Sequence, residues 1–153
     1  MKRHPLVPTL VLAITLAGCT DTESRPDYEG TWTYAAEDLR GDGFTCSIGD
    51  LTLEIENQGG AQDMTGQLFG EFDGTNAEGV MVCTSEAGID SLTIDAGELV
   101  GTFEGTAVTI LLDSGNWENI GNLAGDRMSG LVLRRLDIGG QTVRLDGDFT
   151  ATR

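Results

Sequence analysis

The sequence predicts an all-β protein, a single antiparallel β-barrel of eight to ten strands, with a β-sandwich as the second choice. From Tyr28 onward the apolar residues recur with a period of two, as in Leu51, Leu53 and Ile55, which alternate with polar neighbours. This alternation is typical of antiparallel strands with one packed face and one wet face. Turn dipeptides separate the runs at short, regular intervals, as in small barrels and sandwiches. They are Gly59-Gly60, Asp73-Gly74, Glu104-Gly105, Gly125-Asp126 and Gly139-Gly140.

Taken in chain order, the alternating runs define ten expected strands. Only the segment AAEDLR, residues 35–40, has the composition of a helical turn. The strands are expected near residues 29–36, 43–56, 62–72, 78–85, 91–95, 98–104, 106–113, 116–122, 127–134 and 141–152.

The chain begins with a secretory signal. Lys2 and Arg3 precede an almost wholly apolar segment, residues 6–18, which is shorter than the roughly 20 residues of a membrane-spanning helix. A short apolar helix behind positive charge and ending in small residues is a signal peptide. Residues 1–18 are therefore expected to be a signal helix that is removed on export.

The four residues at the end of this segment, LAGC, resemble the lipobox of bacterial lipoproteins. That resemblance implies that Cys19 is lipidated and becomes the new N-terminus, anchoring the protein to the membrane. An ordinary secreted protein with an incidental cysteine is the alternative. Thr20 follows the cysteine, which by the same resemblance implies sorting to the outer membrane in a Gram-negative host.

The remaining chain is expected to hold a flexible tether, residues 19–27, and one β-domain, residues 28–153. Without Lys2 and Arg3, seven arginines face 25 acidic residues, which gives a net charge of −18. So acidic a domain repels nucleic acid and anionic headgroups, which excludes both as partners of the domain.

An apolar-x-Gly-x-apolar pattern recurs around Gly66, Gly101, Gly130 and Gly147. At period two each glycine faces inward between core side chains, where glycine weakens a strand unless it has a purpose. The purpose is either geometric, to let a strand coil as the barrel closes, or functional, to leave space for a ligand. The ligand alternative predicts a cavity lined by Met64, Leu68, Phe103, Met128 and Val132.

The opening of the first strand, YEGTWTY, contains Gly30-Thr31-Trp32 and resembles the Gly-x-Trp opening of lipocalins and related calycin barrels. That resemblance implies a barrel whose closed end is plugged by Trp32, under an arginine of the last strand. Arg144 or Arg153 is the expected partner, and Arg144 is taken as the first candidate. The chain also looks like bacterial lipoproteins with small glycine-rich β-domains.

Cys46 and Cys83 are the two cysteines left once Cys19 is acylated. Exported proteins meet oxidising conditions, so these two are expected to form one disulfide, with two buried free thiols as the alternative. Neither cysteine is expected to be catalytic, because a nucleophilic thiolate needs a base or a cationic neighbour.

The mature chain contains no histidine and no lysine, since Lys2 and His4 both lie in the signal peptide. This excludes histidine-dependent nucleophile systems, histidine-ligated zinc and lysine Schiff bases. No catalytic residue, metal ligand or cofactor is therefore assigned. Paired carboxylates remain conceivable for a glycosidase, although none is marked out. Asp38, Asp42 and Asp73 could help to hold calcium through oxygen ligands, although no loop has the EF-hand spacing. The adhesion tripeptide Arg40-Gly41-Asp42 is a pattern that often arises by chance.

Three functions remain from the sequence, in this order. The first is a lipid-anchored, non-catalytic structural or interaction domain of the cell envelope, with an envelope protein as partner. The second is a lipocalin-like carrier of a small apolar ligand, and the third a carboxylate-based hydrolase. A filled barrel interior favours the first function and a hollow interior favours the second.

Overall fold

The alternating strands close into a barrel in the computed structural model, which describes residues 25–138 and 140–153. The prediction of an all-β antiparallel barrel is confirmed. The strands are β1 (Gly30–Gly41), β2 (Phe44–Gln58), β3 (Ala61–Gln62), β4 (Leu68–Asn76), β5 (Gly79–Ser85), β6 (Gly88–Ile94), β7 (Gly97–Glu104), β8 (Ala107–Leu112), β9 (Trp117–Ala124), β10 (Arg127–Ile138) and β11 (Gln141–Thr152). A single 3₁₀ turn, η1 (Asp113–Gly115), lies between β8 and β9.

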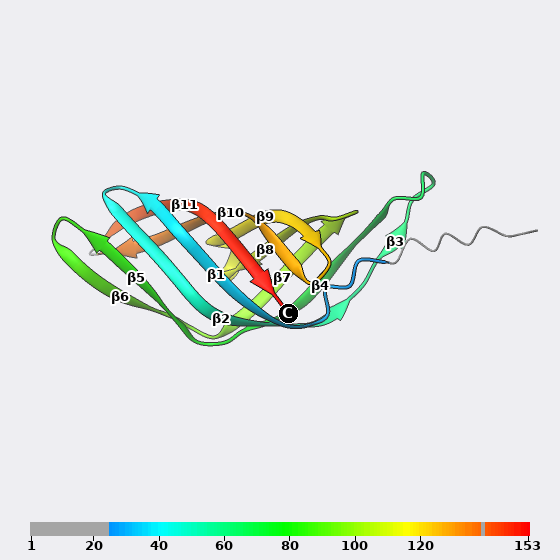
Figure 1. The fold of residues 1–153 in the computed structure, drawn as a ribbon, viewed down its shortest axis with the longest axis horizontal. Coiled ribbons are helices and arrows are strands. Elements are labelled where there is room, and N and C mark those ends of the chain that lie inside the picture. The colour runs from blue at the N-terminus through cyan, green and yellow to red at the C-terminus, as the bar shows by residue number, and fades with distance from the viewer. Residues whose placement is uncertain (1–24, 139) are drawn as a thin grey trace, which may run out of the picture.

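Eight strands form the closed barrel, in the order β4-β7-β8-β9-β10-β11-β1-β2, and pairing of β4 with β2 completes the circle. The β5–β6 hairpin pairs with the first part of β2, and β3 pairs with the start of β4. Of the described strands, β3 and β6 are the two at the edges of the sheet order. They lie at opposite ends of the molecule (Figure 1).

The barrel opens at one end because its strands differ in length. β9 begins at Trp117, which pairs with Arg134, whereas β10 runs on to Ile138 with β11 as its partner. Beyond Arg134 the sheet continues only through β10, β11, β1, β2, β5 and β6, which form a curved half-barrel on one side (Figure 1). Arg134 therefore lies at the boundary between the closed barrel and this open extension.

The barrel interior is filled by aromatic rings that lie over glycines. Gly101 is directly opposite Phe72, and a methyl group added to Gly101 would overlap the Phe72 ring. Gly121 and Gly130 face each other on β9 and β10, where added methyl groups would meet the neighbouring backbone. A methyl on Gly147 would come within 3.0 Å of backbone atoms of β1. At these positions an added side chain has no room, so these glycines do not leave space for a ligand.

The fourth glycine and one turn are corrections to the sequence prediction. Gly66 has φ of +92° and ends a tight turn instead of facing inward in a strand. Asp63 organises this turn, because its carboxylate accepts hydrogen bonds from Thr65 and Gln67, which lower the pKa of Asp63. Conversely, Asp73-Gly74 lies inside β4 and makes no turn.

The segment AAEDLR is also a correction, since it forms the second half of β1 and no helical turn. A bulge between Glu37 and Arg40 lets this run pack Ala36 and Leu39 inward, and Asp38 takes a positive φ of 53° there. The predicted signal helix lies outside the described residues. No helix within residues 25–138 and 140–153 is long and apolar enough to span a membrane.

Candidate functional site

Trp32 occupies one end of the barrel under the last residue of the chain. Its indole is fully buried, and its Nε1 donates a 2.8 Å hydrogen bond to the carbonyl oxygen of Tyr28. The guanidinium of Arg153 lies over the ring, 4.9 Å from its centroid. Arg153 is held there by carboxylates of Asp27 and Asp126, at 3.1 and 2.9 Å, and these pairs raise the pKa of Arg153.

Arg144 does not contact Trp32, so the pairing of Trp32 with Arg144 is corrected in favour of Arg153. Arg144 points outward from β11, between the buried Val143 and Leu145. Its backbone N–H donates to Asp42 beside the β1–β2 turn, far along the strand from Arg153. Alternation along β11 thus excludes Arg144 from the interior.

The cavity expected from the sequence is absent among the described residues, because its five lining residues do not surround one space. Met64 is fully exposed in the turn after β3, and Leu68 is half-buried at the start of β4. Phe103, Met128 and Val132 are buried, but they pack within the filled core. The turn at residues 63–66 moves Met64 out of the barrel.

A buried polar network links β1, β8 and β9 in the interior. The Tyr34 hydroxyl donates to Asn119 Oδ1 at 2.8 Å and accepts a hydrogen bond from Trp117 Nε1 at 3.3 Å. Asn119 Nδ2 in turn donates to the carbonyl oxygen of Ile110 at 3.3 Å. Burial is the main cause that raises the pKa of Tyr34, so this hydroxyl stays neutral as a hydrogen-bond donor.

Arg134 lies next to this network and is buried, with a relative exposure of 5 %. It stands directly opposite Trp117 in the sheet, and its guanidinium carbon lies 4.2 Å from the centroid of the Trp117 ring. Its Nε and Nη1 atoms are buried without a hydrogen-bond partner among the described residues. Burial lowers the pKa of Arg134, and the charges of Asp113 and Tyr34 act in the opposite sense.

A pocket of about 700 Å³ opens above Arg134, at the boundary between the closed barrel and the half-barrel. Its apolar wall includes Leu92, Leu112, Trp117 and Leu136, and four acidic residues also line it. These are Asp95, Glu98, Asp113 and Asp137, all exposed. We call this space the Arg134 pocket.

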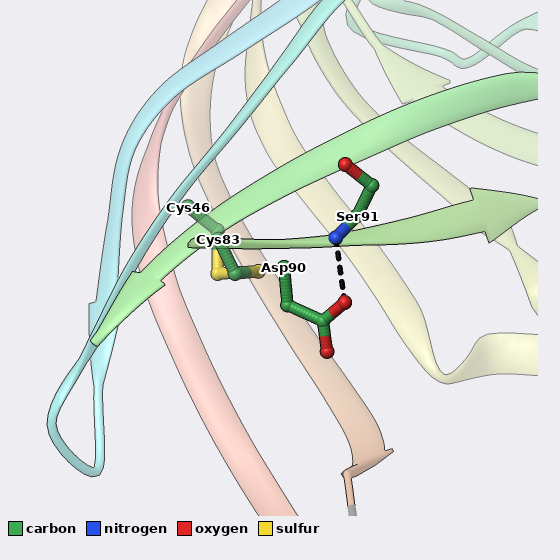
Figure 2. Close-up of a disulfide and its surroundings, with 4 residues drawn as sticks. All are labelled: Cys46, Cys83, Asp90 and Ser91. Carbon is green, nitrogen blue, oxygen red and sulfur yellow. Dashed lines mark hydrogen bonds between the residues drawn. A yellow bond between two sulfur atoms is a disulfide. The ribbon is translucent and has the colours of Figure 1, made fainter. Parts of the chain in front are cut away.

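Cys46 and Cys83 form the expected disulfide, directly opposite each other on β2 and β5. Figure 2 shows this bond beside Asp90 and Ser91 of β6. β6 has β5 as its described neighbour, and β5 meets the rest of the sheet through β2. The disulfide therefore links the β5–β6 hairpin covalently to β2. This hairpin carries Leu92 of the Arg134 pocket.

The remaining site predictions concern the anchor and metals. Cys19 lies outside the described residues, so its lipidation stays a prediction. Asp38, Asp42 and Asp73 do not gather into a metal site, and no cluster of three or more acidic, cysteine or histidine side chains occurs in the described part of the chain.

Arg134, Trp117, Tyr34 and Asn119 were not singled out by the sequence. Strand parity already indicated that they point inward: Arg134 shares the parity of Met128 and Val132. Asn119 and Trp117 are two residues apart in β9, so their side chains lie on the same face of the strand. The pairing of Arg134 with Trp117 follows from the β9–β10 hairpin, whereas the approach of Tyr34 could not be predicted, because 83 residues separate it from Trp117.

Comparison with protein-family models, with curated proteins and with solved structures gives no match to this chain. The fold therefore defines the class of protein: a closed antiparallel barrel of eight strands, consistent with a calycin-like barrel.

Proposed function

We propose that this protein is an exported, lipid-anchored and non-catalytic β-barrel domain that has a structural or interaction role in the cell envelope. The observation that carries this proposal is the filled barrel interior. A carrier of apolar molecules needs space inside its barrel. Here Phe72 occupies that space, since its ring lies over Gly101 and stacks on Tyr28 with 5.0 Å between the ring centroids. The barrel thus offers its surface for binding rather than its interior.

The sequence signals support the export and the anchor. The lipobox ending at Cys19 follows a signal-peptide pattern, and a stable disulfide suits an oxidising compartment. Pro26 and Asp27, expected in the tether, bond to Gln58 and Arg153 at the Trp32 end of the barrel. A lipid on Cys19 would hold that end toward the membrane and leave the Arg134 pocket facing away from it.

The outer surface supports an interaction role. Val100 and Leu111 are directly opposite on β7 and β8, and Ile120 and Leu131 are directly opposite on β9 and β10. All four point outward, and Leu131 is 64 % exposed. Neighbouring apolar side chains on one outer face are typical of surfaces that meet another protein.

The residue types that remain support a non-catalytic role. The mature chain lacks histidine, the most frequent general acid–base residue, and lysine, the residue that forms Schiff bases. Among the described residues, the buried polar or charged side chains are Asn76, Asn119 and Arg134, together with the Tyr34 hydroxyl, which burial keeps neutral.

The anchor is tested by metabolic labelling with a radioactive fatty acid. We expect the wild-type protein to be labelled and to sediment with membranes, because several acyl chains give stable anchoring. The Cys19→Ser variant should be unlabelled and should accumulate as the uncleaved precursor. Equal labelling of both proteins would refute the assignment.

The non-carrier role is tested with an uncharged apolar dye whose fluorescence reports its environment. We expect no saturable binding of the dye inside the closed barrel, because its interior has no space; any binding at the Arg134 pocket should persist when Val132 in the core is replaced. Saturable binding that is lost when Val132 is replaced by tryptophan in a folded variant would reverse the order of the two functions.

A further inference from the structure

The strongest unexplained feature of the molecule is a buried positive charge that forms no salt bridge with the described residues. Arg134 has a relative exposure of 5 %. Two of the three nitrogens of its guanidinium have no hydrogen-bond partner in the described part of the chain. Burying an ionised group is costly unless it is paired and hydrogen-bonded. Arginine cannot escape that cost by losing its proton.

The neighbours of Arg134 compensate only part of this cost. Trp117 contributes a cation–π contact at 4.2 Å, and the charge of Asp113 acts on Arg134 without forming a salt bridge. The cross-strand neighbour on the other side, Leu145, is apolar. The three salt bridges formed by the described residues involve Arg40 and Arg153, so no carboxylate there lies within 4.0 Å of Arg134. Residues 19–153 contain seven arginines and 25 acidic residues, so the missing carboxylate is not due to scarcity.

The guanidinium belongs to the wall of an open pocket rather than to a sealed core. The Arg134 pocket, of about 700 Å³, has room for a small organic molecule. The Trp117 ring and the side chains of Leu112 and Leu136 provide an apolar wall next to the charge. A group that accepts hydrogen bonds from Arg134 would therefore be attached to an apolar body.

The acidic residues of the pocket restrict the ligand further. Asp95, Glu98, Asp113 and Asp137 line the pocket and are exposed, so they surround its solvent-facing part. They repel a molecule that is only an anion, and they attract a positive group that remains near the opening. The charge pattern runs from positive at the buried Arg134 to negative at the opening.

We propose that the Arg134 pocket binds a small zwitterion whose carboxylate accepts hydrogen bonds from the Arg134 guanidinium and whose ammonium group lies among the acidic residues at the opening. The apolar part of the ligand packs on Trp117, Leu112 and Leu136. Arginine pairs with carboxylates through two parallel hydrogen bonds, which supplies the partner that the fold leaves out. Binding of this ligand does not depend on the lipid anchor. The Arg134 pocket adds a small-molecule site to the proposed interaction domain.

The probes are ω-amino acids of four to eight carbons, together with the carboxylate, amine and alcohol that match the six-carbon member. Binding to the purified full-length protein is measured by calorimetry and by the rise in melting temperature. We expect at least one ω-amino acid of the series to bind, and 6-aminohexanoate to bind more tightly than hexanoate, hexylamine or hexanol. This comparison needs no variant, so it does not depend on how a substitution affects folding.

Four variant proteins assign the binding to residues. Arg134→Gln and Arg134→Met remove the charge, and we expect each to weaken ω-amino acid binding by about tenfold or more. Arg135→Gln is the matched control, because the neighbouring Arg135 is exposed and the charge change is identical. Arg134→Met should melt at or above the wild-type temperature without ligand, because it removes an uncompensated buried charge. Glu98→Gln with Asp137→Asn should reduce the preference for the ω-amino acid over hexanoate.

The possible results separate the proposal from its rivals. Binding of hexanoate as tight as that of 6-aminohexanoate would refute the role of the acidic opening. Unchanged binding in Arg134→Met would refute the role of the guanidinium. Failure of every probe to bind the wild type at millimolar concentration would overturn the proposal and leave Arg134 as a structural partner of Trp117.

Discussion

Replacing Gly101 by alanine tests whether the barrel interior is filled. The added methyl group would overlap the ring of Phe72, which is buried and directly opposite Gly101. The ring cannot shift freely, because it stacks on Tyr28 and Tyr28 packs against Phe103 with centroids 5.1 Å apart. Overpacking of this kind costs about 1–3 kcal/mol.

Gly49→Ala is the matched control, because the same change removes the backbone freedom of glycine from the unfolded chain. Gly49 lies in β2 with an ordinary φ, and a methyl group built on it meets nothing within 4 Å. We expect Gly49→Ala to stabilise the protein by about 0.5 kcal/mol. The difference between the two variants then isolates the clash with Phe72.

Chemical denaturation and thermal melting measure this difference. We expect Gly101→Ala to unfold with about 1–3 kcal/mol less free energy than Gly49→Ala, a gap of roughly 4 °C in melting temperature per kcal/mol. Phe72→Leu should relieve the clash, so the free energies of the two single variants should not add in the double variant. If Gly101→Ala is as stable as Gly49→Ala, the space beside Phe72 is open and the filled-interior argument fails.

Three further predictions concern the disulfide, the tyrosines and Arg153. Joint replacement of Cys46 and Cys83 by serine should lower the free energy of unfolding by about 4 kcal/mol, because the disulfide closes a loop with a sequence separation of 37 residues. Amide hydrogen exchange should become faster in β5 and β6, and unchanged exchange there would refute the role of the disulfide in holding the hairpin. The chain has two tyrosines, and burial raises the pKa of Tyr28 from 10.0 to about 12 and raises that of Tyr34 as well. Because both folded-state pKa values exceed the unfolded value, stability should fall as pH rises from 10 toward 12, and a tyrosinate absorbance step near pH 10 without unfolding would contradict this. Arg153→Gln should lower the free energy of unfolding by about 1–2 kcal/mol, because it loses its contacts with Trp32, Asp27 and Asp126. The control Arg144→Gln, at an exposed position, should change it by no more than about 0.5 kcal/mol in denaturation curves. Equal effects of the two variants would refute the stabilising contact of Arg153 with Trp32.

The sequence by itself determined the fold class and most of the strands. Alternation identified β2, β8 and β11, because a half-buried strand must present apolar side chains at every second residue. The disulfide could be predicted because one pairing remained once Cys19 was assigned to the lipid. The same alternation failed at residues 63–66, where the hydrogen bonds of Asp63 make a turn that composition alone did not separate from a strand.

Only the tertiary structure decided which inward side chains meet. The register of the β9–β10 hairpin places Arg134 opposite Trp117, but the closure of the barrel determines that Tyr34 of β1 also meets Trp117. The pairing of β11 with β1, which closes the barrel, likewise makes Arg153 and not Arg144 the partner of Trp32. The Arg153 end of β11 lies beside the start of β1. The physical reason is that the period of a strand fixes the face of each residue, whereas contacts across a barrel depend on the register between strands far apart in sequence.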